Sequence, residues 1–430
     1  MNEIELALNA RAKENVIDPR LDRMELLADA LGSPQLSYPT IHIGGTNGKT
    51  STSRFIDSLL FSMGMRTGCF TSPHLEDFRE RICINGAPIS QEALEFTYND
   101  IKAYFDFVDS KSDQPLSYFE VVTALAFAAF AEHPVDVGIF EVGMGGEWDA
   151  TNVVQPDVAV ITPIGLDHQE YLGSDILQIA QTKSGILKEG AFAVFAEQEP
   201  EVAKLLMRKA AEKSLNVARA GLDFEVVKRQ IAVGGQLLTI RGIKDIYSDL
   251  FLPLHGKHQA QNAALALVAV EAFFGEKELD HDAVREGFAS AASPGRLEVV
   301  KREPTIILDA AHNTHGARAL ANAMQEEFNF DQTIGVVGVF KDKDAAGILL
   351  ELEPVLDSVI VTQSSSERAL PADELATIAR KIFGNDRVYL EADLNKAIEK
   401  ATATNPLSDD SVGVLITGSV TTVGQARSLI

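Results

Sequence analysis

The stretch HIGGTNGKTSTSRF, residues 42–55, combines the residue types of a phosphate-binding loop. A glycine turn between a strand and a helix points its backbone N–H groups, and the positive end of the helix dipole, at an anion above the helix. Lys49 would add a mobile positive charge for the outer phosphates of a nucleotide, and Thr50 or Ser51 would add a hydroxyl for phosphate or Mg²⁺. The usual loop has four residues between its first glycine and the Gly-Lys pair, but here only three precede Gly48. The motif favours a phosphate cradle of unusual length, and the alternative is a turn in which the glycines serve only geometry.

Three further polar side chains follow or continue apolar runs and would complement such a loop. Glu141 ends the apolar run of VDVGIFEVG (135–143), His168 follows another such run, and Lys183 lies in a helix-like segment with few other charges. Ligands gather at the carboxyl ends of strands in α/β sheets, and a carboxylate there is the natural partner of a metal over a phosphate loop. Taken singly, each residue has a structural alternative: a solvated glutamate, a structural histidine or a surface lysine.

A second group of candidates lies in the last third of the chain. Arg296 stands in PGRLEVV, and Asp309, His312 and Asn313 stand in ILDAAHNTHG. An acid followed by His-Asn at a strand end suggests a nucleotide or acyl-phosphate site, and a helix cap with ordinary polar turn residues is the alternative. Arg296 lies at a break in composition, where it would face a cleft between two domains.

The elements that must position these residues alternate between strand-like and helix-like runs. Strand-like runs at 40–45, 66–72, 135–143 and 156–165 are separated by helical patterns, which predicts an α/β fold with a mostly parallel sheet covered by helices. The less regular stretch 223–254 predicts a β-hairpin appended to this domain.

A composition break near SAASPGRLEVV separates this part from a second set of alternating elements. We therefore expect a P-loop domain over residues 1–293 and a smaller Rossmann-like α/β domain over residues 294–430. The strand-like runs of the second domain are 305–313, 333–340, 358–364, 387–392 and 412–419.

The bulk composition limits the classes of partner. The 430 residues carry a formal net charge of −24, which opposes binding to nucleic acid and to acidic membrane surfaces. Any anionic ligand must therefore bind where a few cations and backbone N–H groups gather. Two cysteines and an N-terminus without a signal-peptide pattern predict a cytoplasmic protein. The longest apolar stretch, residues 121–131, is too short for a membrane span and predicts a buried helix.

Taken in order along nearly the whole chain, the motifs resemble those of the Mur ligase superfamily, and within it the folylpolyglutamate synthases and their bifunctional relatives with dihydrofolate synthase activity. The matching motifs are GGTNGKTS, TSPHLEDFRERICING, SYFE, EVGMGGEWDATN, GLDHQEYLG, TKSGI, HGKHQAQNAALA, PGR and LDAAHN. The shortened loop is the form that Mur-type ligases use. Muramyl ligases carry a nucleotide-sugar domain before this loop, and only 43 residues precede Gly44 here, so we do not expect a UDP-muramyl peptide as acceptor.

The resemblance implies a set of site residues. The ATP-binding residues would be Thr46, Asn47, Gly48, Lys49, Thr50, Ser51, Asn262, Arg296 and Asp309, with His312 nearby as a catalytic residue. One Mg²⁺ would be held by Ser72, Glu141 and His168, and a second by Lys183, which the family carbamylates and which would also be catalytic. The pterin side would be formed by Val16, Ile17, Asp18, Pro19, Ser117, Tyr118, Phe119, Trp148, Asp149 and Ala150.

Two departures from the family pattern affect this assignment. Folate members commonly have glycine after the loop lysine, whereas this chain has Thr50, so the sequence leaves open whether Thr50 or Ser51 contacts phosphate or metal. Glu147 and Trp148 stand where many relatives have a basic residue and leucine, which predicts a different wall for the pterin pocket.

The activity implied by the resemblance is the ATP-dependent formation of an amide bond. The carboxylate of a folate or of dihydropteroate would attack the γ-phosphate of ATP, and the amine of L-glutamate would attack the resulting acyl phosphate. A monomer is expected. The alternatives are a related ligase with another acceptor, an ATP phosphotransferase or ATPase without ligation, and a binding protein that keeps the fold. The last is disfavoured because Lys49, Glu141 and His168 are all present.

Overall fold

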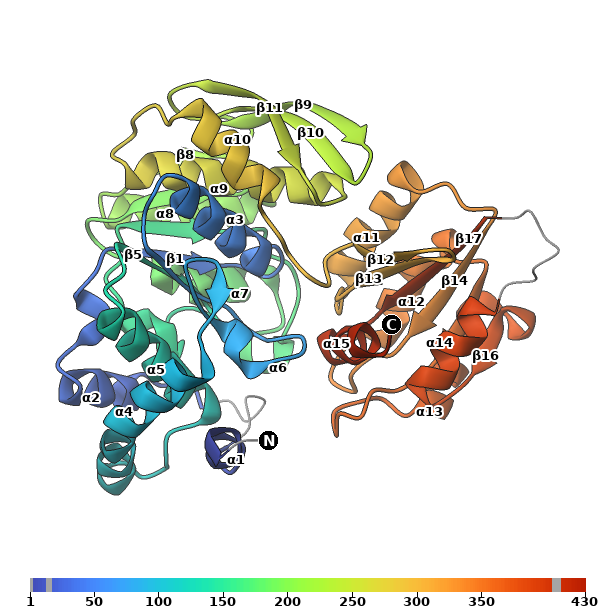
Figure 1. Ribbon diagram of the computed structural model, residues 1–430, viewed down its shortest axis with the longest axis horizontal. Coiled ribbons are helices and arrows are strands. Elements are labelled where there is room, and N and C mark those ends of the chain that lie inside the picture. Colours follow the sequence, from blue (N-terminus) through green and yellow to red (C-terminus); the bar gives the residue numbers. More distant parts are fainter. Residues whose placement is uncertain (1–2, 13–17, 404–410) are drawn as a thin grey trace.

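The computed structural model describes residues 3–12, 18–403 and 411–430 of the protein. Two α/β units lie side by side, the first built on residues up to α10 and the second on residues from β12 onward (Figure 1). A smaller antiparallel sheet lies at the outer side of the first unit, close to the second (Figure 1).

The central sheet of the first unit has eight strands in the described chain. They are, across the sheet, β4 (Ala87–Pro88), β3 (Ile82–Ile84), β2 (Thr67–Phe70), β5 (Val137–Glu141), β1 (Thr40–Gly44), β6 (Val158–Ile161), β7 (Phe192–Phe195) and β8 (Asn216–Arg219). The strands from β2 to β8 pair in parallel, whereas β3 and β4 form an antiparallel edge. Both faces of the central strands are buried, which explains why they read as continuous apolar runs.

Helices cover both faces of this sheet. They are α1 (Glu3–Asn9), α2 (Asp22–Ala30), α3 (Lys49–Ser62), α4 (Gln91–Lys111), α5 (Tyr118–Glu132), α6 (Gln169–Leu172), α7 (Ile176–Lys183), α8 (Pro200–Glu212), α9 (Lys257–Phe273) and α10 (His281–Ala289). Ile41 and Ile43 of β1 pack into the core shared by α3, α9 and α10, while α2, α4 and α5 enclose a core on the opposite face. The predicted buried helix at 121–131 is α5, and it is confirmed as almost completely buried.

The stretch predicted as a hairpin is a three-stranded antiparallel sheet. Its strands are β9 (Glu225–Ala232), β10 (Gly235–Arg241) and β11 (Ile246–Leu252), with β10 in the centre. The hairpin prediction was therefore too small by one strand, because the exposed edge strand β9 lacks a regular alternation of buried and exposed residues.

The second unit is a six-stranded sheet with helices on both faces. Its strands are β12 (Glu298–Arg302), β13 (Thr305–Asp309), β17 (Val412–Thr417), β14 (Gln332–Val337), β15 (Ser358–Val361) and β16 (Val388–Leu390), in that order across the described sheet. Its helices are α11 (Thr314–Glu327), α12 (Ala345–Leu352), α13 (Ala372–Phe383), α14 (Leu394–Thr402) and α15 (Val420–Leu429). All neighbouring strands are parallel except β12, which confirms the predicted fold class. The domain boundary between residues 293 and 294 stays a prediction.

The two units are tied together on both flanks. On one flank the buried carboxylate of Glu327 in α11 pairs with Arg229 of β9 and accepts a hydrogen bond from Gly256 N at 2.7 Å. On the other flank Arg427 of α15 pairs with Glu76. None of the described helices combines the length and the apolar character needed to cross a bilayer.

Candidate functional site

The glycine loop lies between the carboxyl end of β1 and the amino end of α3, as its sequence predicts. Gly48 has a φ of 88°, and a Cβ at this position would come within 2.5 Å of Asn262 Oδ1. Gly45 is equally constrained, because a Cβ there would meet Thr162 Oγ1 at 1.9 Å. Both positions therefore require glycine for close packing as well as for backbone conformation. The loop leaves the first N–H groups of α3 available to an anion.

The polar side chains of the loop are held by neighbouring segments. Thr46 exchanges hydrogen bonds with the backbone of Gly165, at 3.1 and 3.0 Å. Asn47 and Asn313 exchange two amide hydrogen bonds at 3.2 and 3.1 Å, which join the loop to the second unit. The Lys49 ammonium donates to Thr46 O at 3.2 Å, and burial lowers the pKa of Lys49. Lys49 thus lies across the loop as a partly desolvated cation.

Glu141 ends β5 beside the loop, because β5 pairs with β1 and Glu141 lies opposite Ile43. Its Oε1 accepts from Thr50 Oγ1 at 2.9 Å, and its Oε2 accepts from Ser72 N at 3.2 Å. Burial raises the pKa of Glu141, an effect that the positive charge of Lys49 opposes. The Glu141 carboxylate at the end of this strand therefore faces the start of α3.

The structure separates the two hydroxyls that the sequence left open. Thr50 donates to Glu141, whereas Ser51 is buried and shares a hydrogen bond of 3.1 Å with Ser293 in the segment that leads to the second unit. Thr50 is therefore the hydroxyl beside the carboxylate, and Ser51 fixes α3 to the connecting segment.

Lys183 and His168 line the same cavity as the loop. The Lys183 ammonium donates to Gly45 O at 2.7 Å, and burial, with the neighbouring charge of Lys49, lowers the pKa of Lys183 to about 7. His168 has a left-handed backbone with a φ of 50°. Burial lowers the pKa of its imidazole to about 3, so His168 is neutral at neutral pH and can act as a ligand.

These donors fit a divalent cation. Glu141 is buried, and in the described chain its two oxygens accept only neutral hydrogen bonds and take part in no ion pair. A buried carboxylate in this state is stabilised by a cation. Carboxylate and hydroxyl oxygens, which Glu141 and Ser72 supply, are ligands that Mg²⁺ prefers.

The second unit presents three of the predicted residues at the carboxyl end of β13. Asp309 is buried and accepts hydrogen bonds from Leu297 N and Ala311 N, both at 2.8 Å. Burial raises the pKa of Asp309, while the charge of Arg296 opposes this shift. Burial lowers the pKa of Arg296, which forms no ion pair within the described part of the chain. His312 Nδ1 donates a hydrogen bond to Ala310 O at 2.9 Å.

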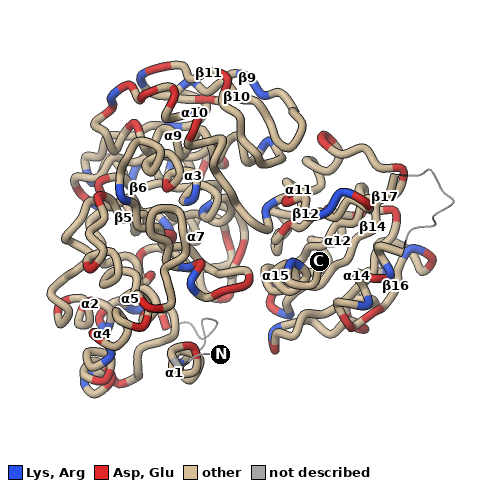
Figure 2. Tube along the Cα trace, viewed as in Figure 1, with Lys and Arg blue, Asp and Glu red and all other residues tan. Residues whose placement is uncertain are grey.

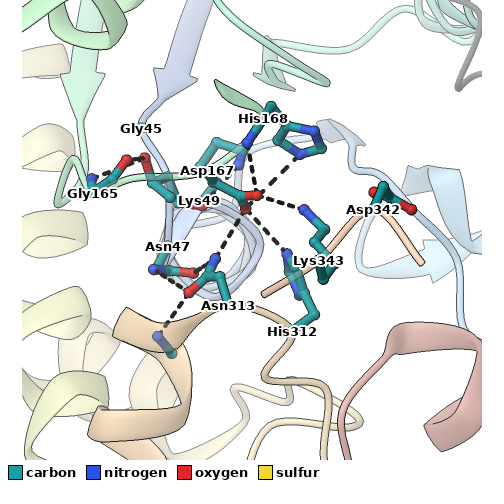
Figure 3. A network of polar contacts seen from close by, with 12 residues as sticks. Gly45, Asn47, Lys49, Gly165, Asp167, His168, His312, Asn313, Asp342 and Lys343 are labelled. Carbon is teal, nitrogen blue, oxygen red and sulfur yellow. Dashed lines mark hydrogen bonds and ion pairs between the residues drawn. The ribbon is translucent and has the colours of Figure 1, made fainter. Parts of the chain in front are cut away.

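Asp167 joins the two units at the centre of the site (Figure 3). Its carboxylate accepts from Lys343 Nζ at 2.5 Å and from Asn313 Nδ2 at 3.0 Å, and it lies 3.6 Å from His312 Nε2. Burial opposes ionisation, but the adjacent His312 side chain and the surrounding positive charges hold the pKa of Asp167 well below its usual range. Lys343 was not among the predicted site residues, since the only local signal is a lysine between two aspartates after an apolar run.

All of the predicted nucleotide-binding and metal-binding residues, together with Asp167 and Lys343, line one cavity of about 2400 Å³ between the two units. Part of the predicted pterin side lines the same cavity, namely Asp18, Ser117, Phe119, Trp148, Asp149 and Ala150. Among the described residues, Pro19 and Tyr118 do not line it, and Tyr118 instead packs beneath the Arg81 guanidinium. Val16 and Ile17 lie outside the described residues. Asp149 also lines the cavity, and its carboxylate oxygens accept hydrogen bonds from Thr151 and from the backbone N–H of Met144.

Basic side chains gather at this cavity although the protein as a whole is acidic. Acidic positions are interspersed with fewer basic ones over both units, in keeping with 62 acidic and 38 basic residues (Figure 2). Lys49, Lys183 and Arg296 nevertheless gather around one cavity, and no acidic side chain of the described chain pairs with them at ion-pair distance. Such a cluster of partly buried cations suits a ligand with several negative charges.

Comparison with known proteins gives matches over nearly the full chain. Residues 43–270 match the Mur ligase middle domain, and residues 295–420 match the Mur ligase, glutamate ligase domain. The chain is 49% identical to the dihydrofolate synthase/folylpolyglutamate synthase of Mycobacterium tuberculosis, with 99% of this chain and 93% of that protein covered.

Solved structures agree with these matches. Crystal structures of Mycobacterium tuberculosis folylpolyglutamate synthase complexed with ADP and AMPPCP superpose with a TM-score of 0.94 at 50% identity, covering 99% of this chain and 97% of that one. E. coli FolC in complex with DHPP and ADP superposes with a TM-score of 0.86 at 31% identity, covering 99% and 96%. The chain therefore belongs to the Mur ligase superfamily and, within it, to the family of folylpolyglutamate and dihydrofolate synthases.

Proposed function

We propose that the protein is an ATP-dependent ligase that joins L-glutamate to folates through an amide bond, and that it also accepts dihydropteroate. One observation carries the proposal: the glycine loop before α3 faces the same cavity as the buried carboxylate of Glu141, which forms no ion pair among the described residues, and the walls of this cavity come from both units. The full-length similarity to proteins named for these two activities supports the same reaction.

The nucleotide would lie over the amino end of α3. In this proposal Lys49 and the N–H groups from Thr46 to Ser51 bind the phosphates, and Asn262, Arg296 and Asp309 complete the nucleotide site. Supporting this, Arg296 is a cation without an ion pair in the described chain, and Asn262 packs directly on Gly48. Phosphoryl transfer depends mainly on positioning and on neutralising charge, which such a set of donors supplies.

Two Mg²⁺ ions belong to the proposal, and when bound they neutralise negative charge on the phosphates. Glu141, Ser72 and His168 would hold one of them, and Lys183, once carbamylated, would help to hold the other. CO₂ reacts with a neutral amine, and a lysine with a pKa of about 7 is neutral in a large fraction of molecules at neutral pH.

The acceptor carboxylate would attack the γ-phosphate of ATP and release ADP. The glutamate amine would then attack the carbonyl carbon of the acyl phosphate, form the amide and release phosphate. An acyl phosphate hydrolyses in water, so the second unit must shield it. His312 and Lys343 from that unit already lie against Asp167 of the first unit (Figure 3). The monomeric state and the cytoplasmic location expected from the sequence belong to the same proposal.

The test is ATP-dependent incorporation of labelled glutamate, assayed in parallel with dihydropteroate and with a tetrahydrofolate. We expect incorporation with both acceptors and none when ATP or Mg²⁺ is omitted. Phosphate release that does not depend on glutamate would instead identify an ATPase or phosphotransferase. Incorporation with only one acceptor would restrict the proposal to that activity.

A further inference from the structure

The last residue of α11 fastens the second unit to the first. The side chain of Glu327 is 0% exposed, and its polar partners among the described residues all belong to the first unit. Its Oε1 pairs with the Arg229 guanidinium and accepts from Gly256 N at 2.7 Å, while its Oε2 accepts from His255 Nδ1 at 2.9 Å. We call this set of four residues the clasp. Both carboxylate oxygens are bonded to charged or fixed donors, so the clasp has a defined geometry.

The half of the clasp that belongs to the first unit is itself held in place. Arg229 Nε donates to Gln236 Oε1 at 2.6 Å, and Gln236 is completely buried. Gln236 Nε2 in turn donates to two backbone carbonyls of the segment before α9, at 2.8 and 3.1 Å. The ring of His255 packs on Phe328, with the ring centroids 5.1 Å apart. Glu327 is therefore received by groups that cannot move independently of the first unit.

The clasp lies at one end of a helix whose other end reaches the candidate site. Asn313, the residue that caps the start of α11, donates to Asn47 and to Asp167 at 3.1 and 3.0 Å (Figure 3). The helix has 14 residues and ends at Glu327. At 1.5 Å per residue its axis is about 21 Å long, and a helix of this length moves as one rod. Fixing its last turn therefore restricts the tilt of its first turn over the glycine loop.

The covalent connection between the units lies at the other flank. Gly295 of the connecting segment packs on Leu75, because a Cβ at this glycine would come within 3.0 Å of Leu75 Cδ1. The neighbouring Glu76 pairs with Arg427, and both of these side chains are about one-third exposed. An exposed ion pair contributes little to stability, whereas breaking a buried one is costly. The connecting segment thus serves as a hinge, and the clasp holds the flank away from it.

We propose that Glu327 is a positioning residue for ligation: by clasping the last turn of α11 to the first unit, it keeps Asn313 and the preceding His312 over the glycine loop, so that the acyl phosphate passes to glutamate and not to water. The inference rests on the proposed function, which puts an acyl phosphate in this cavity. Without the clasp the second unit stays attached through its hinge, but its position over the cavity fluctuates and water enters.

The side reaction that the clasp suppresses is hydrolysis of the acyl phosphate. Water forms a bond to the carbonyl carbon, and the bond from that carbon to the phosphate oxygen breaks. The products are the original acceptor carboxylate and inorganic phosphate, so ATP is consumed and no amide forms. The ratio of phosphate released to glutamate incorporated therefore reports on the clasp, and it can be measured in one reaction with saturating ATP, Mg²⁺, glutamate and the acceptor that the parent protein uses.

In Glu327→Ala this ratio should rise about threefold or more above that of the parent, because the cavity no longer excludes water. The excess phosphate should appear only when the acceptor is present. The KM for the acceptor should stay close to that of the parent, since the residues proposed to bind the acceptor belong to the first unit. A general loss of structure would instead lower phosphate release and glutamate incorporation together and leave their ratio unchanged.

Three comparisons sharpen the test. Glu326→Gln is the matched control, because Glu326 pairs with the same Arg229 guanidinium at 3.1 Å but has a side chain that is 48% exposed, and its ratio should equal that of the parent. Glu327→Asp keeps the charge on a shorter side chain, so its ratio should be intermediate. In an Arg229→Ala background, Glu327→Ala should raise the ratio less than it does alone, since the two residues act through one contact.

Thermal melting of each variant shows whether it is folded. If Glu327→Ala does not fold, Glu327→Gln takes its place, because glutamine still accepts from Gly256 N but is no longer an anion beside Arg229, and it should also raise the ratio. A ratio equal to that of the parent in the folded variants, the same rise in Glu326→Gln, or excess phosphate without acceptor would overturn the inference. A parent protein that incorporates no glutamate with any folate or with dihydropteroate would overturn the proposed function itself.

Discussion

The helix that carries the phosphate loop contains a buried carboxyl group that the site does not use. Asp57 lies two turns after Lys49 in α3 and is 6% exposed. Burial raises the pKa of Asp57 from an ordinary 3.8 to about 6, although the nearby Thr67 side chain and the charge of Arg54 oppose the shift. Its Oδ1 has no hydrogen-bond partner among the described residues. The folded state therefore accommodates the ionised form poorly.

The sign of the effect on stability follows from this pKa. The folded protein retains the Asp57 proton in a pH range where the unfolded chain has already lost it, so the free energy of unfolding falls as pH rises from 3.8 to about 6. Linkage gives a loss of about 1.6 kcal/mol at pH 5 and about 3 kcal/mol at pH 8. The protonated Asp57 carboxyl makes its full contribution to the free energy of unfolding only below pH 3.8.

Asp57→Asn removes the ionisable group while keeping the shape of the side chain. Any packing or hydrogen-bonding cost of the amide is independent of pH. The informative quantity is therefore how the difference in unfolding free energy between the variant and the parent changes with pH. We expect the stability of the variant relative to the parent to increase by about 1.4 kcal/mol between pH 5 and pH 8. Urea unfolding followed by the fluorescence of Trp148 measures this difference in the unit that contains α3.

The control is Asp100→Asn, an exposed aspartate on α4, which supplies the baseline for replacing a carboxylate by an amide. Glutamate ligation should be retained in Asp57→Asn, because the substitution leaves the loop residues in place. A difference between variant and parent that is constant from pH 5 to pH 8 would refute the reasoning. It would mean that Arg54 and Thr67 stabilise the ionised carboxylate enough to compensate for its burial.

Three further predictions concern the proposed reaction. Lys49→Ala should lower the rate of ligation about a hundredfold, roughly 3 kcal/mol, by removing a charge that stabilises the transferring phosphoryl group; turnover near that of the parent would make the loop merely structural. Glu141→Gln and His168→Ala should each raise the Mg²⁺ concentration needed for activity, with a combined effect smaller than the sum, whereas additive effects at unchanged Mg²⁺ dependence would contradict a shared site. Lys183→Arg should be nearly inactive and Lys183→Glu less damaged, because only the latter restores an anion, and a crystal structure of the parent should show extra density on the Lys183 amine; an active Lys183→Arg variant with an unmodified Lys183 in the parent would exclude the carbamate.

The parts of the site that are local in sequence could be predicted from it. The loop from Gly44 to Lys49 joins a strand directly to a helix, so its position follows from the two elements that flank it. The position of Glu141 could be predicted for another reason, since the carboxyl ends of parallel strands share one edge of a sheet. The register that puts Glu141 opposite Ile43 brings its carboxylate to Thr50 at the start of α3.

The orientation of neighbouring residues on a helix could not be predicted with the same ease. Successive residues on an α-helix point about 100° apart, so Thr50 and Ser51 face different partners, Glu141 and Ser293. The same rotation applies at the start of α5, where Phe119 lines the cavity while Tyr118 packs beneath Arg81. A motif read as a block of three letters therefore contained residues on two different faces.

Contacts between segments that are far apart in the chain could not be predicted from the sequence. Lys343 and Asp167 are 176 residues apart, and Arg23 and Glu120 are 97 apart. Each pair combines ordinary charged residues whose local context resembles a solvated surface. What distinguishes them is burial against a second segment, and this burial depends on how distant segments pack rather than on any local pattern.

The charges of the buried basic side chains decide what the cavity can bind. Burial lowers the pKa values of Lys49 and Arg296, so the folded protein holds two cations in an environment that disfavours their charge. Proteins accept such a cost at functional sites when a ligand relieves it. A triphosphate and a carboxylate acceptor would supply the missing negative charges, and the relief of the desolvated cations would appear as binding free energy and as added stability of the folded state. A chain with a net charge of −24 can in this way bind several anions at once, because its local cations are partly buried and not neutralised by its own acidic residues.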